Sequence, residues 1–275
     1  MRARSLLFTP ATKLDKLEKA RGTGADWIIL DLEDGVAPEE RTRCREVLKE
    51  WARKIDTQQI AGIALRINSL NTIDGLRDVL ALTDWPVPPP MIVLPKVESA
   101  AEIAQCRSLL DEGIISADIL AVFETAQGVL NAAQILHNAP AVAAIAFGSA
   151  DYAAETGCGM DWDSLAWARG MIVAAAGQNN TLALDGVWLD FKDEAGLREE
   201  SERVEKMGFA GKIAIHPHQV GPINTVFTPA SDLVEDSRAM LAQAKAEGRG
   251  AFNFRGRMVD KPILERAKRI VAAAG

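Results

Sequence analysis

WIILDLED, residues 27–34, is the stretch of the sequence that decides the fold. Four apolar residues (27–30) run on without a polar interruption and lead directly into three carboxylates within four positions. A short apolar run without alternation is typical of a strand buried on both faces, as in a parallel sheet. Similar runs predict seven further strands, at SLLF (5–8), IALRI (63–67), MIVL (91–94), ILAVF (119–123), VAAIAF (142–147), TLAL (181–184) and KIAI (212–215).

Amphipathic stretches with helix signals separate these runs. Pro38-Glu39-Glu40 opens one helix with acids in its first turn, and a second helix is predicted over 98–113. Eight strands in alternation with helices predict an α/β fold, a TIM (β/α)8 barrel. A doubly wound open sheet is the alternative, but its first turn is often Gly-rich, whereas the turn here reads FTPAT (8–12).

The chain continues beyond the last strand that a barrel needs. We predict the barrel over 1–228 and a C-terminal helical extension over 229–275. Within the extension, 231–247 and 261–274 have helical patterns, and 248–257 reads as an extended or turn segment. The extension could cap the bottom of its own barrel, or it could reach the active face or a neighbouring subunit.

Composition limits the classes of function. Of 275 residues 48% are hydrophobic, and the net charge is −7, which argues against a nucleic-acid partner. The longest apolar runs fall far short of the ~20 residues that cross a bilayer, so no membrane partner is expected. Charges at Asp15 and Lys16 come too early for a secretory signal, and three cysteines form no recognisable disulfide or zinc pattern. A cytoplasmic location is therefore predicted.

Polar residues follow the predicted strands directly. In a barrel, the groups at the carboxyl ends of strands converge on one rim, where catalytic residues are found. The residues concerned are Asp31, Glu33, Asp34, Arg66, Asn68, Lys96, Glu124, Thr125, Ser149, Asp151, His216 and His218. So many charges on one rim are costly to desolvate unless they pair or a metal is present.

Glu124 and Asp151 are the best candidates for metal ligands. Mg²⁺ often takes only one or two protein carboxylates and completes its octahedron with water and substrate oxygens. The alternative is that each acid simply caps the helix that follows its strand.

Arg66 and Lys96 each allow two interpretations. Arg66 either pairs with Asp31 or Glu33, or its guanidinium faces a carbonyl or enolate oxygen of the substrate. Lys96 could form a Schiff base, but a carboxylate partner on the rim is the better interpretation. The His216-Pro-His218 turn is interpreted as a structural loop rather than a metal site.

The N-terminal segment carries a local positive patch in an acidic protein. Its members are Arg2, Arg4, Lys13, Lys16, Lys19 and Arg21. The patch is either a solvated helix face or a seat for a phosphate-bearing ligand such as a coenzyme A tail.

Eight motifs in a fixed order give the chain a specific resemblance. They are RSLLFTP (4–10), LDLEDGV (30–36), LRIN (65–68), LPK (94–96), ETAQGVLNA (124–132), FGSADY (147–152), GKIAIHPHQ (211–219) and GRMVDKPILERAK (256–268). The set resembles the citrate lyase β-subunit-like (CitE-like) family of the HpcH/HpaI aldolase superfamily, over essentially the whole chain.

The resemblance implies a TIM barrel, a homotrimer with active sites at subunit interfaces, Mg²⁺ and an acyl-CoA thioester substrate. By motif, Glu124 and Asp151 match the metal carboxylates, and Arg66 matches the residue at the thioester carbonyl. Asp34 matches a carboxylate that holds a metal-bound water, and Asp260 matches a catalytic residue supplied by the adjacent subunit. Phe8, Pro10, Lys13 and Gly148 are the implied substrate and coenzyme A contacts, although FTPATKLDK (8–16) is shorter than the family loop and lacks its Gly-Asn-Arg.

The resulting prediction is a Mg²⁺-dependent lyase that cleaves a 3-hydroxyacyl-CoA into acetyl-CoA and a 2-oxo acid. Citramalyl-CoA, citryl-CoA and malyl-CoA are the candidate substrates, with a preference for a stand-alone citramalyl or malyl type. The alternatives are a citrate lyase β subunit acting on a carrier-protein thioester, an aldolase acting on free 2-oxo acids, a thioesterase or synthase variant, and a non-catalytic barrel.

Overall fold

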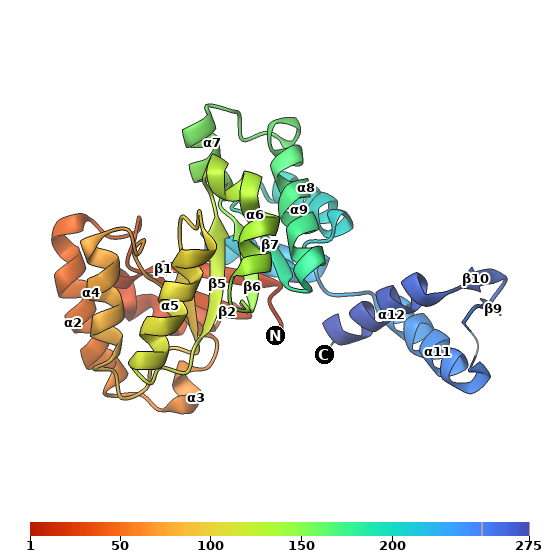
Figure 1. Ribbon diagram of the computed structural model, residues 1–275, viewed down its shortest axis with the longest axis horizontal. Coiled ribbons are helices and arrows are strands. Elements are labelled where there is room, and N and C mark those ends of the chain that lie inside the picture. Colours follow the sequence, from red (N-terminus) through yellow and green to blue (C-terminus); the bar gives the residue numbers. More distant parts are fainter. Residues whose placement is uncertain (249, 275) are drawn as a thin grey trace.

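The computed structural model describes residues 1–248 and 250–274, and within them eight strands close into one parallel barrel in chain order (Figure 1). This confirms the predicted TIM barrel. The strands are β1 (Ser5–Pro10), β2 (Trp27–Asp31), β3 (Ile63–Arg66), β4 (Met91–Leu94), β5 (Asp118–Phe123), β6 (Ala144–Phe147), β7 (Leu182–Asp185) and β8 (Gly211–Ala214).

Helical segments connect the strands and cover the outside of the barrel. They are η1 (Ala11–Lys16), α1 (Leu17–Arg21), η2 (Pro38–Glu40), α2 (Arg41–Ala52), α3 (Thr57–Ile60), α4 (Ile73–Leu82), α5 (Ala100–Glu112), α6 (Ala126–Asn138), α7 (Ser149–Thr156), α8 (Trp162–Asn179), α9 (Glu194–Met207) and α10 (Pro217–Val226). The predicted acidic opening at Pro38 is a short 3-10 turn that leads into α2.

Alternate residues of each strand face two different cores. One set, which includes Leu6, Ile29, Ala64 and Leu120, fills the inside of the barrel, while their neighbours pack against the surrounding helices. Both faces of the strands are therefore apolar, which is why the runs in the sequence show no alternation. We call the positions of a strand that face the inside of the barrel its inner phase. Because side chains alternate along a strand, this phase also sets which residues beyond the strand end point into the rim.

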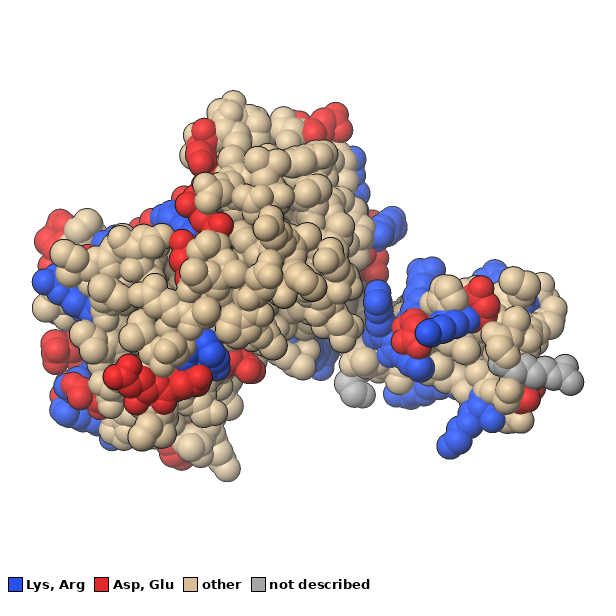
Figure 2. All heavy atoms as spheres, viewed as in Figure 1, with Lys and Arg blue, Asp and Glu red and all other residues tan. Residues whose placement is uncertain are grey.

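A C-terminal arm stands away from the barrel (Figure 1). It consists of α11 (Ser231–Glu247), the hairpin β9 (Phe252–Phe254) and β10 (Arg257–Val259), and α12 (Lys261–Ala273). Phe252, Phe254 and Val259 form a small core of its own, and Figure 2 shows the arm as a separate lobe with many Lys and Arg side chains on the visible face. The predicted helical extension is thus present, while its boundary at 229 and its contact with a neighbour remain predictions. Arg249 and Gly275, which belong to the predicted extension, lie outside the described residues.

Four charged side chains form a buried cluster, distinct from the rim, between β7, β8 and the helices α8 and α9. Lys212 contacts Asp185 and lies 2.8 Å from Glu200, and Arg169 lies 2.9 Å from Asp185 and 3.0 Å from Glu200. Both cations and Asp185 are at most 1% exposed. Two positive and two negative charges balance there, so the cluster joins two helices to two strands without a net buried charge.

Lys212→Met is expected to destabilise the fold by about 3–5 kcal/mol, because Asp185 and Glu200 would then share Arg169 as their only cation. For a chain of this length, that loss corresponds to a fall in Tm of roughly 6–10 °C. Lys206→Met, at an exposed position of α9, is the matched control and should leave Tm nearly unchanged. Equal Tm values for the two variants would show that the buried cluster does not stabilise the fold.

Candidate active site

The rim at the carboxyl ends of the strands is lined by the residues that continue the inner phase of each strand. Continuing that phase by steps of two from Leu6, Ile29, Ala64, Leu120 and Ala144 reaches Phe8, Asp31, Arg66, Glu124 and Gly148. The phase also includes Glu33, two residues beyond Asp31. The strands therefore direct these side chains into one place, although their positions in the chain are far apart.

Arg66 is held rigidly by Asp31. The two residues occupy paired positions of β3 and β2, and Asp31 accepts from Nε at 2.6 Å and from Nη2 at 2.7 Å. Although burial opposes the charge, the bonds to Asp31 raise the pKa of Arg66, so its guanidinium stays protonated. The Arg66 Cζ also lies 4.5 Å from the centre of the Phe8 ring. The ion pair, one of the two interpretations of Arg66, is therefore present, and it leaves Nη1 pointing toward the other carboxylates.

Glu33 connects Arg66 with Lys96. Its Oε1 accepts from Lys96 Nζ at 2.7 Å, and its Oε2 lies 3.0 Å from Arg66 Nη1. This confirms a carboxylate partner for Lys96. Asp34 is more distant, 3.6 Å from Nη1, and its side chain is 52% exposed against 5% for Glu33. The predicted role of Asp34, to hold a metal-bound water, remains a prediction, and Glu33 is the more deeply buried carboxylate of the two.

Glu124 is buried at the end of β5 and does not cap a helix. The cap of α6 is the Thr125 hydroxyl, and α7 begins without a side-chain cap, so neither Glu124 nor Asp151 has the capping role weighed above. Burial, followed by the charges of Glu33 and Asp151, raises the pKa of Glu124 to about 8. Carboxylates that oppose one another's ionisation in this way either stay protonated or ionise beside a cation.

The residues present fit Mg²⁺. Glu124 and Asp151 are close enough for the charge of Asp151 to act on Glu124, and Mg²⁺ often takes only one or two protein carboxylates. The Glu33 Oε2 is buried and lies 3.0 Å from Arg66 Nη1 without a well-aligned hydrogen bond, so it keeps acceptor capacity for a water at the rim. Oxygen donors of this kind suit a hard divalent cation rather than zinc or copper.

Gly148 is required by the close approach of Glu124. A Cβ atom at this position would overlap both Cβ and Oε2 of Glu124. Glycine is therefore required at position 148 by packing, and a contact between Gly148 and the substrate remains a prediction.

Gly148→Ala is expected to lower kcat by about 100-fold, because a shift of roughly 1 Å in a catalytic carboxylate can cost that much. Gly170→Ala in α8, where a Cβ meets no atom within 4 Å, is the control and should retain activity. Steady-state rates and Tm of both variants test this expectation. Full activity of Gly148→Ala would mean that Glu124 can move without consequence.

Other predicted residues lie at the edge of the site or outside it. Pro10 is paired with Asp31 in the barrel, and Lys13 is exposed in η1, where its backbone departs from helical angles. Asp260 lies in the arm and caps α12 by accepting from Ile263 N at 3.5 Å. His216 caps α10 through Nδ1, which accepts from His218 N, in agreement with a structural His-Pro turn.

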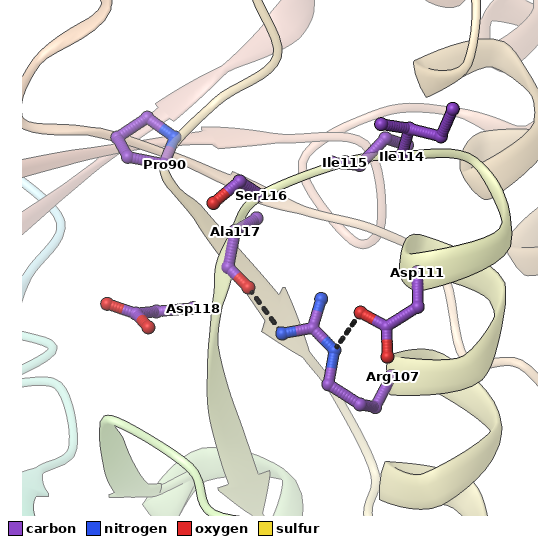
Figure 3. Close-up of a pocket in the computed structure, with 8 residues that line it drawn as sticks. All are labelled: Pro90, Arg107, Asp111, Ile114, Ile115, Ser116, Ala117 and Asp118. Atoms are coloured by element: carbon purple, nitrogen blue, oxygen red, sulfur yellow. Dashed lines mark hydrogen bonds and ion pairs between the residues drawn. The ribbon is translucent and has the colours of Figure 1, made fainter.

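A cavity of about 570 Å³ lies at the opposite end of the barrel, beside the start of β5. Figure 3 shows Arg107 among its lining residues, with one bond to the Ala117 carbonyl at 2.8 Å and a contact to Asp111 at 3.1 Å. Arg107 Nε and Nη2 have no hydrogen-bond partner among the described residues, but the charge of this side chain is paired with Asp111, and catalytic groups of such barrels come from the carboxyl ends of the strands. The rim, and not this cavity, is the candidate active site.

Sequence and structure comparisons place the chain among known proteins. Residues 4–217 match the family described as HpcH/HpaI aldolase/citrate lyase. A "(3S)-malyl-CoA thioesterase" of Cereibacter sphaeroides is 35% identical over 98% of this chain and 94% of its own length. An "L-malyl-CoA/beta-methylmalyl-CoA lyase" of Rhodobacter capsulatus is 34% identical over the same shares.

A crystal structure of the protein CitE from Mycobacterium tuberculosis with magnesium, acetoacetate and coenzyme A superposes with a TM-score of 0.79. It is 32% identical and covers 99% of this chain and 98% of that one. Among the described residues, no helix combines the length and the apolar character that a membrane span requires. The family match and the shared barrel agree with the resemblance seen in the motifs: the chain belongs to the HpcH/HpaI aldolase/citrate lyase family and is a carbon–carbon lyase.

Proposed function

We propose that this chain is a Mg²⁺-dependent lyase that cleaves a 3-hydroxyacyl-CoA into acetyl-CoA and a 2-oxo acid. The observation that carries the proposal is the rim itself, where buried Glu124 and neighbouring Asp151 lie beside a guanidinium held in place by Asp31. The proposal includes coenzyme A and magnesium because a relative is named as a malyl-CoA lyase and a superposable CitE was crystallised with both.

Glu124 and Asp151 would hold the metal, which supplies Lewis-acid polarisation of the substrate's oxygen atoms. Arg66 would place Nη1 against the thioester oxygen, where negative charge develops as the carbon–carbon bond breaks. One well-oriented donor of this kind contributes about 3–4 kcal/mol to the transition state. Asp31 prevents the guanidinium from turning away, and Glu33 and Asp34 provide acceptors on the same side of it.

Asp260 would supply the proton to the acetyl-CoA carbon from a neighbouring subunit, in a homotrimer with active sites at the interfaces. The arm supports this proposal because it stands clear of its own barrel (Figure 1) and exposes apolar side chains at Leu233, Met258 and Ile263. Exposed apolar groups on a small lobe are typical of a surface that is covered in an assembly.

Phe8, Pro10 and Lys13 would contact the coenzyme A portion of the substrate. Phe8 lies against Arg66, and Lys13 follows it on the segment that leaves β1. Lys13 is exposed, and its ammonium would pair with a phosphate of the coenzyme tail.

The test is product formation from malyl-CoA, citramalyl-CoA and citryl-CoA, each with Mg²⁺ and with EDTA. We expect Mg²⁺-dependent release of acetyl-CoA from one of them, and the 2-oxo acid formed identifies the substrate. If folded protein releases acetyl-CoA from none of the three, the proposal is wrong as stated. A carrier-protein thioester or a free 2-oxo acid would then be the substrate to assay.

Hydrolysis of the thioester at the same site is a second candidate activity beside cleavage, because the 35% identical relative is named as a malyl-CoA thioesterase. Hydrolysis of malyl-CoA releases malate and free coenzyme A, whereas cleavage releases glyoxylate and acetyl-CoA. The same assay therefore separates the two activities by its products.

A further inference from the structure

Lys96 has an unusual backbone conformation at the rim. It follows β4 with φ of 52°, in the left-handed region that non-glycine residues seldom adopt. Among the described residues, only Ile114, Asn180 and Arg255 share a positive φ without being glycine. Conformations of this kind tend to occur at functional sites and persist only where the surroundings enforce them.

The left-handed turn gives Lys96 two contacts in two directions. Its backbone N–H donates to Glu124 Oε1 at 2.9 Å, while its ammonium donates to Glu33 Oε1 at 2.7 Å. Immediately afterwards, Val97 N returns to the barrel by donating to Val122 O at 3.1 Å. The chain therefore leaves the strand ladder for Pro95 and Lys96, and this departure directs the N–H into the rim.

The contact with Glu124 matters because few other groups hold that carboxylate. Gly148 leaves room for Glu124 without bonding to it, and the acids Glu33 and Asp151 both repel its charge. When Glu124 is ionised, as a metal ligand must be, the Lys96 N–H donates to a charged acceptor, and hydrogen bonds of this kind are among the stronger ones in proteins. It is also attached to the backbone, so its position does not depend on a flexible side chain.

We propose that Lys96 is a positioning residue for the metal carboxylate Glu124, acting through the backbone N–H that its left-handed conformation aims at Oε1. The inference rests on the proposed function, since it takes Glu124 as a metal ligand. The ammonium has a separate task, which is to hold Glu33 beside Arg66.

Three variants that all lack the ammonium separate the backbone from the side chain. Lys96→Gly accepts the left-handed conformation freely, Lys96→Met accepts it as lysine does, and Lys96→Val resists it because a β-branched residue is poorly accommodated there. Mg²⁺ affinity is measured by calorimetric titration of the substrate-free protein. We expect Lys96→Val to bind Mg²⁺ about 10-fold or more weakly than the other two, the usual effect of losing a bond to a metal ligand.

Asn180→Val is the matched control for strain. Asn180 has the same φ of 52° at the end of α8, where it serves as the C-cap. It should lose Tm as Lys96→Val does but keep the Mg²⁺ affinity of the wild type. If Lys96→Val does not fold, Lys96→Ala is the milder replacement, because alanine also disfavours the left-handed conformation but less strongly. The Mg²⁺ affinity of Lys96→Ala should then lie below that of Lys96→Gly.

Equal Mg²⁺ affinity of the glycine, methionine and valine or alanine variants would overturn the positioning role while leaving the proposed function intact. A wild-type protein that binds no Mg²⁺, either alone or with a 2-oxo acid present, would instead overturn the metal-dependent function, and the positioning role with it. The two failures are therefore distinguishable in one set of titrations.

Discussion

Glu124→Gln should lower kcat/KM by about 100- to 1,000-fold, the range found when one electrostatic group is removed from a catalytic site. The amide has the same shape as the carboxylate, so it fits the space that Gly148 leaves and can still accept from Lys96 N. What it lacks is the negative charge that a divalent cation needs. Rates at increasing Mg²⁺, with Glu112→Gln at an exposed position of α5 as the control, measure the effect.

Glu124→Gln is also expected to change how Tm depends on pH in the metal-free protein. Because the pKa of Glu124 is raised from 4.5 to about 8 in the folded state, protonation favours folding. Its stabilising contribution is fully present below pH 4.5 and is lost as pH rises through about 8. In EDTA, the wild type should therefore lose Tm over this range, and Glu124→Gln should lose less. Identical Tm profiles, or full activity with Mg²⁺, would exclude Glu124 as the buried metal carboxylate.

Asp260→Asn should lower turnover by about 100- to 10,000-fold, the contribution of a general acid or base. Asparagine is the informative replacement because Asp260 also caps α12, and asparagine caps a helix about as well as aspartate does. Asp260→Ala removes both the acid and the cap, at a further cost of about 1 kcal/mol in helix stability. If Asp260→Asn keeps its activity while Asp260→Ala loses it, the residue is only a cap.

Mixing the two inactive proteins tests whether the arm acts on a neighbour. A subunit with Glu124→Gln still has an intact Asp260, and a subunit with Asp260→Asn still has an intact rim. If each site combines one subunit's rim with the next subunit's arm, equal and random mixing restores about a quarter of the sites. Each variant refolded alone is the control, and no recovery in mixed, fully exchanged oligomers would contradict a shared site.

The strands were the most predictable part of the structure. MIVL (91–94) and β4 have the same bounds, and β6 begins at Ala144, only two residues after the predicted start. Buried parallel strands leave a local signal, since both of their faces contact apolar groups and most positions are therefore apolar. The carboxylates, Arg66 and Lys96 could be placed at the rim because strand ends share one side of a barrel.

The relation between neighbouring residues of the rim was less predictable. In LDLED, the resemblance assigned a role to Asp34, which is half exposed, but gave no sign that Glu33 is buried against Arg66 and Lys96. Side chains at every second position point the same way, so Glu33 shares the side of Asp31. The sequence alone does not show which of the two sets of alternate positions faces the inside of the barrel. The left-handed turn of Lys96 left no signal, because lysine has no special preference for that conformation.

By itself, the sequence determined the barrel, the C-terminal helices, the family and the residue types available for chemistry, because these depend on local periodicity and ordered motifs. Only the tertiary structure decided which carboxylates are buried together, that Asp31 holds Arg66, and that a backbone N–H holds Glu124. The reason is that closure of the barrel sets the inward phase of each strand and brings distant strand ends within hydrogen-bonding distance. Burial at that rim then raises the pKa of Glu124 and makes a cation favourable there.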